Sequence, residues 1–289
     1  MTDASLSGKN YVVTGANSGI GLFAARRFAE LGANVALVCR NEQRGQKAVA
    51  ELVAATGNEK ISLYLADFSS LASVAEMADS LLLDIPAIDV LCNNAGGANA
   101  SRTTTDEGFE TTFVSNHLSS FLLTKKLLPA ILKAADEDLA RIIFTSSYGH
   151  FNSALDFDDL GLEEGYSTLK AYGRSKLMNL LTARELQSRL TGKNVVTSSF
   201  HPGTVRTPIW NKGGVPARLL GLVMYPFMKS VEQGSDTFIW LASSQDPASR
   251  GADGHYFYER KRAQVAKFAT DEEAKRLWQL SEELVAAYC

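Results

Sequence analysis

The sequence predicts an α/β protein with one doubly wound, mostly parallel sheet that helices cover on both faces. Three observations predict this class. Short apolar runs rich in β-branched and aromatic residues alternate with longer helical patterns. Most of those runs are apolar on both faces, as strands of a buried parallel sheet are. No linker or low-complexity segment divides the 289 residues, so a single domain over residues 1–289 is expected.

Seven runs are expected to form strands, at residues 11–14, 34–39, 61–65, 89–94, 141–147, 195–200 and 255–258. Helical patterns lie between and after them, at 20–31, 42–56, 71–82, 111–132, 170–190, 232–243 and 272–287. Gly32 and Gly57 follow the first two helical patterns directly, as glycines that end helices do.

Composition excludes several classes of function. The net charge is −3 and no basic run reaches five residues, so nucleic acid is not an expected partner. Cys39, Cys92 and Cys289 are widely spaced and form no CxxC pair. This predicts neither disulfides nor a metal site, and it fits a reducing, cytoplasmic location. We expect no signal peptide, and no transmembrane segment because 18 consecutive apolar residues never occur.

A glycine-rich stretch, TGANSGIG at 14–21, lies between the first strand and the first helix. Gly15, Gly19 and Gly21 permit a tight turn and a close approach of the backbone to a pyrophosphate. The N-terminus of the following helix supplies unpaired N–H groups and a partial positive charge. The stretch therefore predicts a dinucleotide site.

The end of the second strand indicates which dinucleotide binds. Dinucleotide-binding proteins that prefer NAD place Asp or Glu there, to accept a hydrogen bond from the ribose 2′-hydroxyl. Cys39 occupies that neighbourhood here, and Arg40 and Arg44 follow it. Because a guanidinium suits a 2′-phosphate, we expect NADP(H). The alternative is that Arg40 is only a solvated loop residue.

The GxxxGxG spacing resembles the pattern of short-chain dehydrogenases/reductases. The resemblance continues through NNAG (93–96), SNHL (115–118), RIIFTSS (141–147), YGRSK (172–176) and HPGTVRT (201–207). It is closer to the retinol dehydrogenase-like members, with protochlorophyllide reductases as the nearest neighbours. SNHLSS lacks the glycine that commonly follows NHL, and the N-terminal anchor of membrane-bound relatives is not expected here. The resemblance implies a Rossmann domain with a seven-stranded sheet in the order 3-2-1-4-5-6-7.

The resemblance also implies the site residues. The catalytic set would be Asn116, Ser147, Tyr172 and Lys176. The cofactor set would be Gly15, Asn17, Ser18, Gly19, Ile20, Gly21, Arg40, Asp67, Phe68, Asn94, Ala95, Gly96, Tyr172, Lys176, Pro202, Gly203, Val205 and Thr207. Thr14 and Asn93 would tie strands near the cofactor.

Each catalytic residue has an expected role. Tyr172 would be the acid and base, and Lys176 would favour its phenolate and hold the nicotinamide ribose. Ser147 would donate to the substrate oxygen. Asn116 would bend its helix and hold a water that leads to Lys176.

The spacing Tyr-x-x-x-Lys occurs twice, in GYSTLKAYGRSK at 165–176. Either pair could share a helix face. Tyr172 with Lys176 begins a long amphipathic pattern, whereas Tyr166 with Lys170 follows an acidic, loop-like stretch. We therefore expect Tyr172 to be catalytic and Tyr166 to be a packing residue near the helix start.

Two segments depart from the strand–helix rhythm. An insertion, 148–171, separates Ser147 from Tyr172 by 24 residues, and its His150 is expected to lack a catalytic role. An apolar stretch, 208–230, resembles a substrate lid and indicates a lipophilic substrate. Weak membrane contact through this lid, and a homodimer through the helices at 111–132 and 170–190, stay open alternatives.

The expected function is NADP(H)-dependent hydride transfer to or from a hydrophobic carbonyl compound or alcohol. A reductase of carbon–carbon double bonds on the same fold is the first alternative, because it would use the same Tyr and Lys. A non-catalytic NADP(H)-binding regulator is the second, although a complete catalytic set argues against it.

Overall fold

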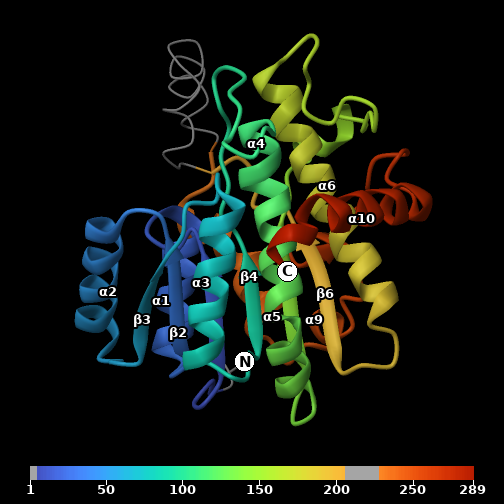
Figure 1. Ribbon diagram of the computed structural model, residues 1–289. Coiled ribbons are helices and arrows are strands. Elements are labelled where there is room, and N and C mark those ends of the chain that lie inside the picture. The colour runs from blue at the N-terminus through green and yellow to red at the C-terminus, as the bar shows by residue number, and fades with distance from the viewer. Residues whose placement is uncertain (1–4, 206–227) are drawn as a thin grey trace.

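Eight strands form one central sheet in the computed structural model, which describes residues 5–205 and 228–289 (Figure 1). The order across the sheet is β3-β2-β1-β4-β5-β6-β7-β8. The strands are β1 (Asn10–Thr14), β2 (Asn34–Cys39), β3 (Ile61–Leu65), β4 (Val90–Asn93), β5 (Ala140–Thr145), β6 (Val195–Phe200), β7 (Tyr256–Tyr258) and β8 (Lys261–Arg262). The first seven run parallel, which confirms the predicted Rossmann order.

The edge strand β8 was not predicted. It pairs antiparallel with β7 through Phe257 with Arg262 and Tyr258 with Lys261. The two residues of the connecting turn, Glu259 and Arg260, have φ values of 50° and 58°. Two left-handed residues in a two-residue loop make the turn that matches strand twist. Because asparagine and glycine usually occupy such turns, the residues Glu259 and Arg260 did not indicate a turn in the sequence.

The helices lie close to the predicted ranges. They are α1 (Gly19–Glu30), α2 (Glu42–Thr56), α3 (Leu71–Asp84), α4 (Thr111–Phe113), η1 (Val114–Leu118), α5 (Ser119–Ala135), η2 (Tyr148–Asn152), α6 (Thr168–Arg189), α8 (Val231–Ser243), α9 (Pro247–Arg250), α10 (Asp271–Val285) and η5 (Ala286–Tyr288). The predicted helix at 111–132 is therefore interrupted by a π-helical turn, η1, which contains Asn116.

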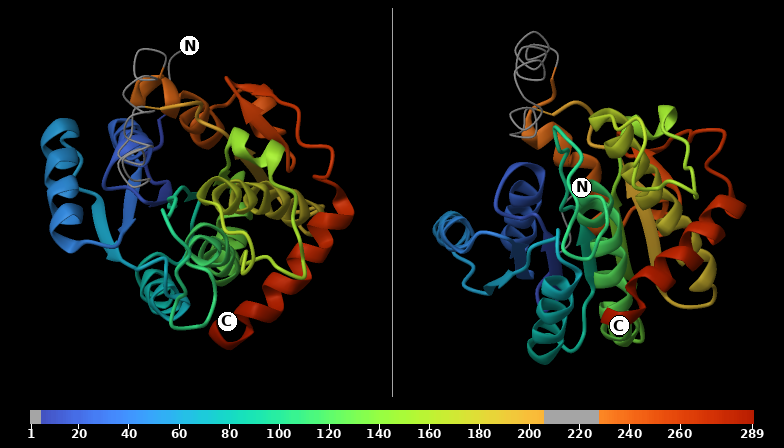
Figure 2. Two further views of the ribbon diagram at one scale, coloured as in Figure 1. Left: turned by 90° about the horizontal axis from the view of Figure 1, so that it is seen from above. Right: turned by 45° about the horizontal axis from the view of Figure 1, so that its top comes forward.

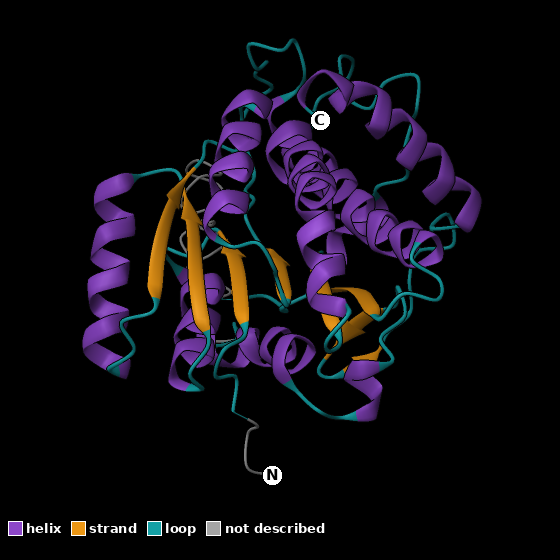
Figure 3. Ribbon diagram, turned by 60° about the horizontal axis from the view of Figure 1, so that its bottom comes forward, coloured by secondary structure: helices purple, strands orange, loops and turns teal. Residues whose placement is uncertain are grey.

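Helices cover both faces of the sheet, as the doubly apolar strands require (Figures 2 and 3). Val13 of β1 and Ile143 of β5 pack in the cluster that includes α1, α2 and α8. Their neighbours Val12 and Ile142 pack in the cluster that includes α3, α5 and α6. Successive strand residues point to opposite faces, so each strand contributes to both cores.

The C-terminal helix α10 packs across α6 and α5 (Figure 1). The rings of Trp278 on α10 and Phe121 on α5 lie 4.8 Å apart. The Arg189 guanidinium of α6 lies 4.7 Å above the Trp278 ring. This helix therefore covers part of the surface of both long helices.

Candidate active site

The carboxyl ends of the central strands open into a cleft of about 1050 Å³. In an open α/β sheet this edge is where ligands bind. Of the predicted site residues, the following line the cleft: Gly15, Asn17, Ser18, Gly19, Ile20, Gly21, Arg40, Asp67, Phe68, Asn94, Ala95, Gly96, Ser147, Tyr172, Lys176, Pro202, Gly203 and Val205. Asn116 lies buried behind them. Thr207, and most of the predicted lid 208–230, fall outside the described residues.

The glycine turn forms the floor of the cleft at the start of α1. Gly15 and Gly19 have φ values of 66° and 57°, which favour glycine. A Cβ atom on Gly21 would lie 2.6 Å from the Gly15 carbonyl oxygen and 2.5 Å from Asn94 Nδ2. The N-cap residue of α1, Ser18, makes no side-chain capping bond. The first N–H groups of α1 are therefore open to an anionic ligand.

The NNAG segment is tied to the glycine turn through Thr14. The Thr14 hydroxyl oxygen accepts from the N–H groups of Asn94 and Ala95, each at 2.9 Å. Asn94 Nδ2 donates back to the Thr14 carbonyl oxygen at 2.9 Å. Asn93, one residue earlier, points elsewhere and donates to the Thr124 hydroxyl. Thr14 and Asn94 thus fix the segment next to the cleft.

The end of β2 places two arginines, Arg40 and Arg44, along the cleft. The Arg40 side chain is 71% exposed, and its guanidinium lies 3.7 Å from the Asp67 carboxylate. Cys39, before it, is buried. No carboxylate stands at the first residue after the strand, so a guanidinium is the group available there to a ligand's negative charge.

Ser147 and Tyr172 bring two hydroxyls together at the end of β5 and the start of α6. Burial raises the pKa of Tyr172, and a hydrogen bond from the Ser147 hydroxyl opposes that rise. The Ser147 oxygen also accepts from the Gly149 N–H at 3.2 Å. Burial therefore favours the protonated form of Tyr172 at neutral pH.

Lys176 lies one turn beyond Tyr172 on α6. Its Nζ atom is 5.5 Å from the centre of the Tyr172 ring and donates to the Thr145 carbonyl oxygen at 3.1 Å. Asn179 Nδ2 donates to the same oxygen at 3.1 Å. Burial lowers the pKa of Lys176 to about 8. Asn179 was missed from the sequence, although its spacing of three from Lys176 on a helix could have indicated it.

Asn116 is held by the segment that follows NNAG. Its Oδ1 atom accepts from the Gly97 N–H at 2.8 Å, and its Nδ2 atom donates to the Gly97 carbonyl oxygen at 2.8 Å. A Cβ atom on Gly96 would lie 2.9 Å from Asn116 Oδ1 and 3.2 Å from Lys176 Nζ. The structure therefore brings Asn116 Oδ1 and Lys176 Nζ together on the side of Gly96 where a Cβ atom would stand.

The second tyrosine–lysine pair is not assembled. α6 begins at Thr168, so Tyr166 lies before the helix and does not share a helical face with Lys170. The Tyr166 hydroxyl donates to the Asn99 carbonyl oxygen at 3.3 Å, and Lys170 is exposed. Tyr166 thus anchors a loop.

The insertion 148–171 packs directly against α6. Gly173 makes this possible, because a Cβ atom there would meet Ser153 Oγ and would lie 2.6 Å from the Gly149 carbonyl oxygen. The buried Arg174 donates to the carbonyl oxygens of Ala154, at 3.0 Å, and Asp159, at 2.6 Å. The insertion therefore supports the Ser147 side of the site.

His150, in the insertion, is fully buried. Its Nδ1 atom lies 2.6 Å from the Ser147 carbonyl oxygen, and its Nε2 atom is 3.3 Å from the Ala266 N–H. Nε2 therefore accepts and Nδ1 donates, which fixes a neutral ring. Burial lowers the pKa of His150, so it stays neutral near pH 7 and holds the Ser147 backbone in place.

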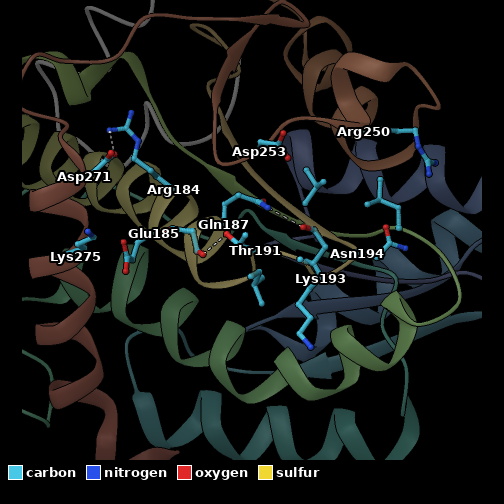
Figure 4. Close-up of a pocket in the computed structure, with 16 residues that line it drawn as sticks. Arg184, Glu185, Gln187, Thr191, Lys193, Asn194, Arg250, Asp253, Asp271 and Lys275 are labelled. Atoms are coloured by element: carbon cyan, nitrogen blue, oxygen red, sulfur yellow. Dashed lines mark hydrogen bonds and ion pairs between the residues drawn. The ribbon is translucent and has the colours of Figure 1, made fainter.

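A second pocket, of about 690 Å³, lies at the opposite end of the sheet, around Asn194 and Val195 at the start of β6 (Figure 4). Two of its charged side chains have ion-pair partners: Arg184 lies 3.6 Å from Asp271, and Glu185 accepts from Arg189, which lies outside the pocket, at 2.8 Å. The pocket contains none of the predicted site residues.

Two further features are absent from the described residues. No group of three or more His, Cys, Asp or Glu residues there is arranged to hold a metal ion. In that same part of the chain, no helix combines the length and the apolar character needed to cross a membrane.

Comparisons with known proteins agree with this geometry. The family model described as short chain dehydrogenase matches residues 9–214. Retinol dehydrogenase 14 of Mus musculus is 38% identical over 97% of this chain and 86% of its own length. A Streptomyces sp. (strain C5) protein with the provisional name daunorubicin C-13 ketoreductase DnrU is 39% identical, over 96% of this chain and 92% of its own length.

Solved structures agree in fold. An uncharacterized protein from Mycobacterium paratuberculosis superposes with a TM-score of 0.79 at 29% identity, over 99% of this chain and 96% of that chain. L-Sorbose reductase from Gluconobacter frateurii, complexed with NADPH and L-sorbose, superposes with a TM-score of 0.70 at 21% identity, over 93% of this chain and all of that one. The matched model, the relatives and the assembled site together place the chain in the short-chain dehydrogenase/reductase family, within its retinol dehydrogenase-like subgroup.

Proposed function

We propose that this protein is an NADP(H)-dependent oxidoreductase that acts on a hydrophobic carbonyl compound or the corresponding alcohol, with Tyr172 as acid and base. One observation carries the proposal. The Ser147 hydroxyl stands next to Tyr172, where it opposes the rise in the Tyr172 pKa, and the Lys176 ammonium lies beside the Tyr172 ring. This set stands at the wall of a cleft whose floor is the glycine turn.

The residues present fit a nicotinamide dinucleotide. At Gly15 and Gly21 a Cβ atom would collide with Asn94 or with the turn itself, so only glycine lets the turn pack against the NNAG segment. The open N-terminus of α1 suits the pyrophosphate. Arg40, highly exposed at the end of β2, would bind a 2′-phosphate in NADP(H). When bound, the nicotinamide would supply or accept the hydride.

Proton transfer follows from the arrangement of hydroxyls. In reduction, negative charge develops on the carbonyl oxygen, and Tyr172 donates its proton there. Ser147 donates a second hydrogen bond to that oxygen. The Lys176 ammonium, with a pKa near 8, then favours the resulting phenolate and is mostly charged at pH 7. In oxidation the same groups act in the reverse sense.

A lipophilic substrate is supported by the cleft and by the relatives. The cleft wall near Tyr172 includes apolar groups such as Leu169 and Val205. The relatives carry names that refer to retinol and to daunorubicin. The predicted apolar lid, 208–230, lies mostly outside the described residues, so it supports a lipophilic substrate through its amino-acid sequence alone.

Two matched variants test the mechanism. NADPH consumption is measured with a panel of lipophilic ketones, aldehydes and enones for the wild type, Tyr172→Phe and Tyr166→Phe. We expect Tyr172→Phe to lower kcat at least about 100-fold, because general acid catalysis contributes about that much. Tyr166→Phe should alter at most the KM. Undiminished turnover by Tyr172→Phe would overturn the mechanism.

The same screen separates the alternative functions. Saturated carbonyl products from the enones would indicate reduction of carbon–carbon double bonds. Tight NADPH binding without turnover of any substrate would indicate a non-catalytic regulator. Every observation that supports one of these two alternatives also supports the carbonyl reaction.

Location and assembly are part of the proposal. A reducing, cytoplasmic location is supported by the three free cysteines, Cys39, Cys92 and Cys289. A homodimer through 111–132 and 170–190 would have to form beside the strip that α10 covers on α5 and α6. Cell fractionation and light scattering would test these two points.

A further inference from the structure

Two large hydrophobic side chains that are close in sequence to Ser147 and Tyr172 stand exposed. Among the described residues, the large hydrophobic side chains with high exposure include Tyr148, at 63%, and Leu169, at 81%. Tyr148 directly follows Ser147 in the chain. Leu169 precedes Tyr172 by three residues, so Leu169 and Tyr172 lie on the same side of α6. Leu169 lines the cleft. Tyr148 is not among the residues that line the cleft, but its neighbour Ser147 is. The exposed Tyr148 ring therefore belongs to the surface beside the cleft.

Tyr148 is backed by other rings. Its ring centre lies 4.8 Å from that of Phe151 and 6.2 Å from that of His201. The His201 ring in turn stacks on Tyr258 at 4.4 Å, with an angle of 17° between the planes. We call Tyr148, Phe151, His201 and Tyr258 the aromatic shelf. Because its inner members contact each other, the shelf holds the Tyr148 ring in position while leaving much of it exposed.

The shelf is uncharged near the reactive hydroxyls. Burial lowers the pKa of His201 to about 4, so its ring is neutral at pH 7. Lys229, a cation that contacts the shelf, lies 4.4 Å above the Tyr258 ring and binds Glu259 at 2.8 Å. An aromatic surface without net charge favours a flat, uncharged ring system, since aromatic rings attract each other through offset and edge contacts.

We propose that Tyr148 determines substrate specificity, and that the site prefers carbonyl compounds whose carbonyl carbon is bonded to a planar aromatic ring over their saturated counterparts. The inference rests on the proposed function, because it locates the carbonyl at Ser147 and Tyr172. The aromatic ring would lie against Tyr148, with Leu169 on the opposite side. Tyr148 itself transfers no proton.

The test compares two ketones with the same carbon skeleton, acetophenone and cyclohexyl methyl ketone, in the full-length protein with NADPH. For the wild type we expect a higher kcat/KM with acetophenone. Loss of one ring contact corresponds to a change of roughly three- to tenfold. Tyr148→Ala and Tyr148→Leu should therefore lower kcat/KM for acetophenone by roughly that factor, mainly through KM, and change that for cyclohexyl methyl ketone less than about twofold.

Two control variants complete the test. Tyr148→Phe keeps the ring and should keep the preference. Leu83→Ala removes a side chain that is 86% exposed on α3 and should leave kcat/KM unchanged for both ketones. Equal losses for both ketones in Tyr148→Ala and Tyr148→Leu, or no loss in either, would overturn the inference.

The proposed function can fail separately. If the wild type reduces neither ketone, binding of acetophenone to the protein with NADPH is measured by calorimetry. Binding that Tyr148→Ala and Tyr148→Leu weaken and Tyr148→Phe retains would support the shelf. Binding that is absent, or equal in all variants, would overturn it. Conversely, turnover that Tyr172→Phe abolishes but Tyr148→Leu leaves unchanged would support the function and refute the shelf.

Discussion

Substitution of Gly173 by alanine should impair catalysis more than folding. The added Cβ atom would meet Ser153 Oγ and lie 2.6 Å from the Gly149 carbonyl oxygen, so η2 must move away from α6. Such overpacking costs about 1–3 kcal/mol, whereas Gly→Ala inside a helix gains up to about 1 kcal/mol. The net loss of stability is therefore about 0–3 kcal/mol.

The catalytic effect of Gly173→Ala is larger because η2 begins next to Ser147. Ser147 is the N-cap residue of η2, and Tyr172 directly precedes Gly173. A displacement near 1 Å between catalytic groups can lower the rate about 100-fold. We expect kcat/KM to fall about 10- to 100-fold.

The assay combines steady-state kinetics with thermal unfolding, and Gly161→Ala is the matched control. Gly161 lies in the same insertion, but a Cβ atom there would lie at ordinary distances of 3.6 Å from Glu110 and 3.7 Å from Arg102. That variant should keep wild-type activity and stability. Wild-type kcat/KM in Gly173→Ala, or an equal loss in both variants, would refute the reasoning.

Three further predictions concern the cofactor and the lysine. Gly21→Ala should lower the affinity for NADPH at least about tenfold, as measured by calorimetry, because the new Cβ atom would lie 2.5 Å from Asn94 Nδ2. Unchanged affinity would contradict the role of the glycine turn in binding the dinucleotide. Arg40→Ala should raise the Kd of NADPH roughly tenfold and leave that of NADH within about twofold, with Arg26→Ala on α1 as the control. Carbonyl reduction should fall as pH rises through about 8, because Lys176 loses its charge above its pKa; a flat profile of kcat/KM to pH 10 would contradict this.

The strand order and the cleft floor could be predicted because local signals and the fold agree there. The β-branched runs are apolar on both faces, and the parallel sheet buries both faces. The glycines of TGANSGIG stand where left-handed φ values or close contacts exclude a side chain. At such positions the presence of glycine directly indicates the backbone conformation or the close contact that is needed there.

Other features depend on contacts between distant residues, which a single sequence does not reveal. The π-helical turn at Asn116 lies within a pattern that looks continuously helical. The packing of the insertion depends on Gly173, which accepts Ser153 and Gly149 from 20 or more residues away. The turn before β8 uses Glu259 and Arg260, neither of which is a typical turn residue.

The two tyrosine–lysine pairs show why burial, and not spacing alone, makes a catalytic pair. Tyr172 and Lys176 share a helix whose first turns face the core, and Lys176 is only 2% exposed. Burial moves the pKa of Lys176 down and that of Tyr172 up, which opposes charge on either group. Proton transfer from tyrosine to substrate creates a phenolate that a nearby ammonium can stabilise far better there than in water. Lys170 is exposed, so its charge is screened by solvent and could not assist Tyr166 even at the same spacing.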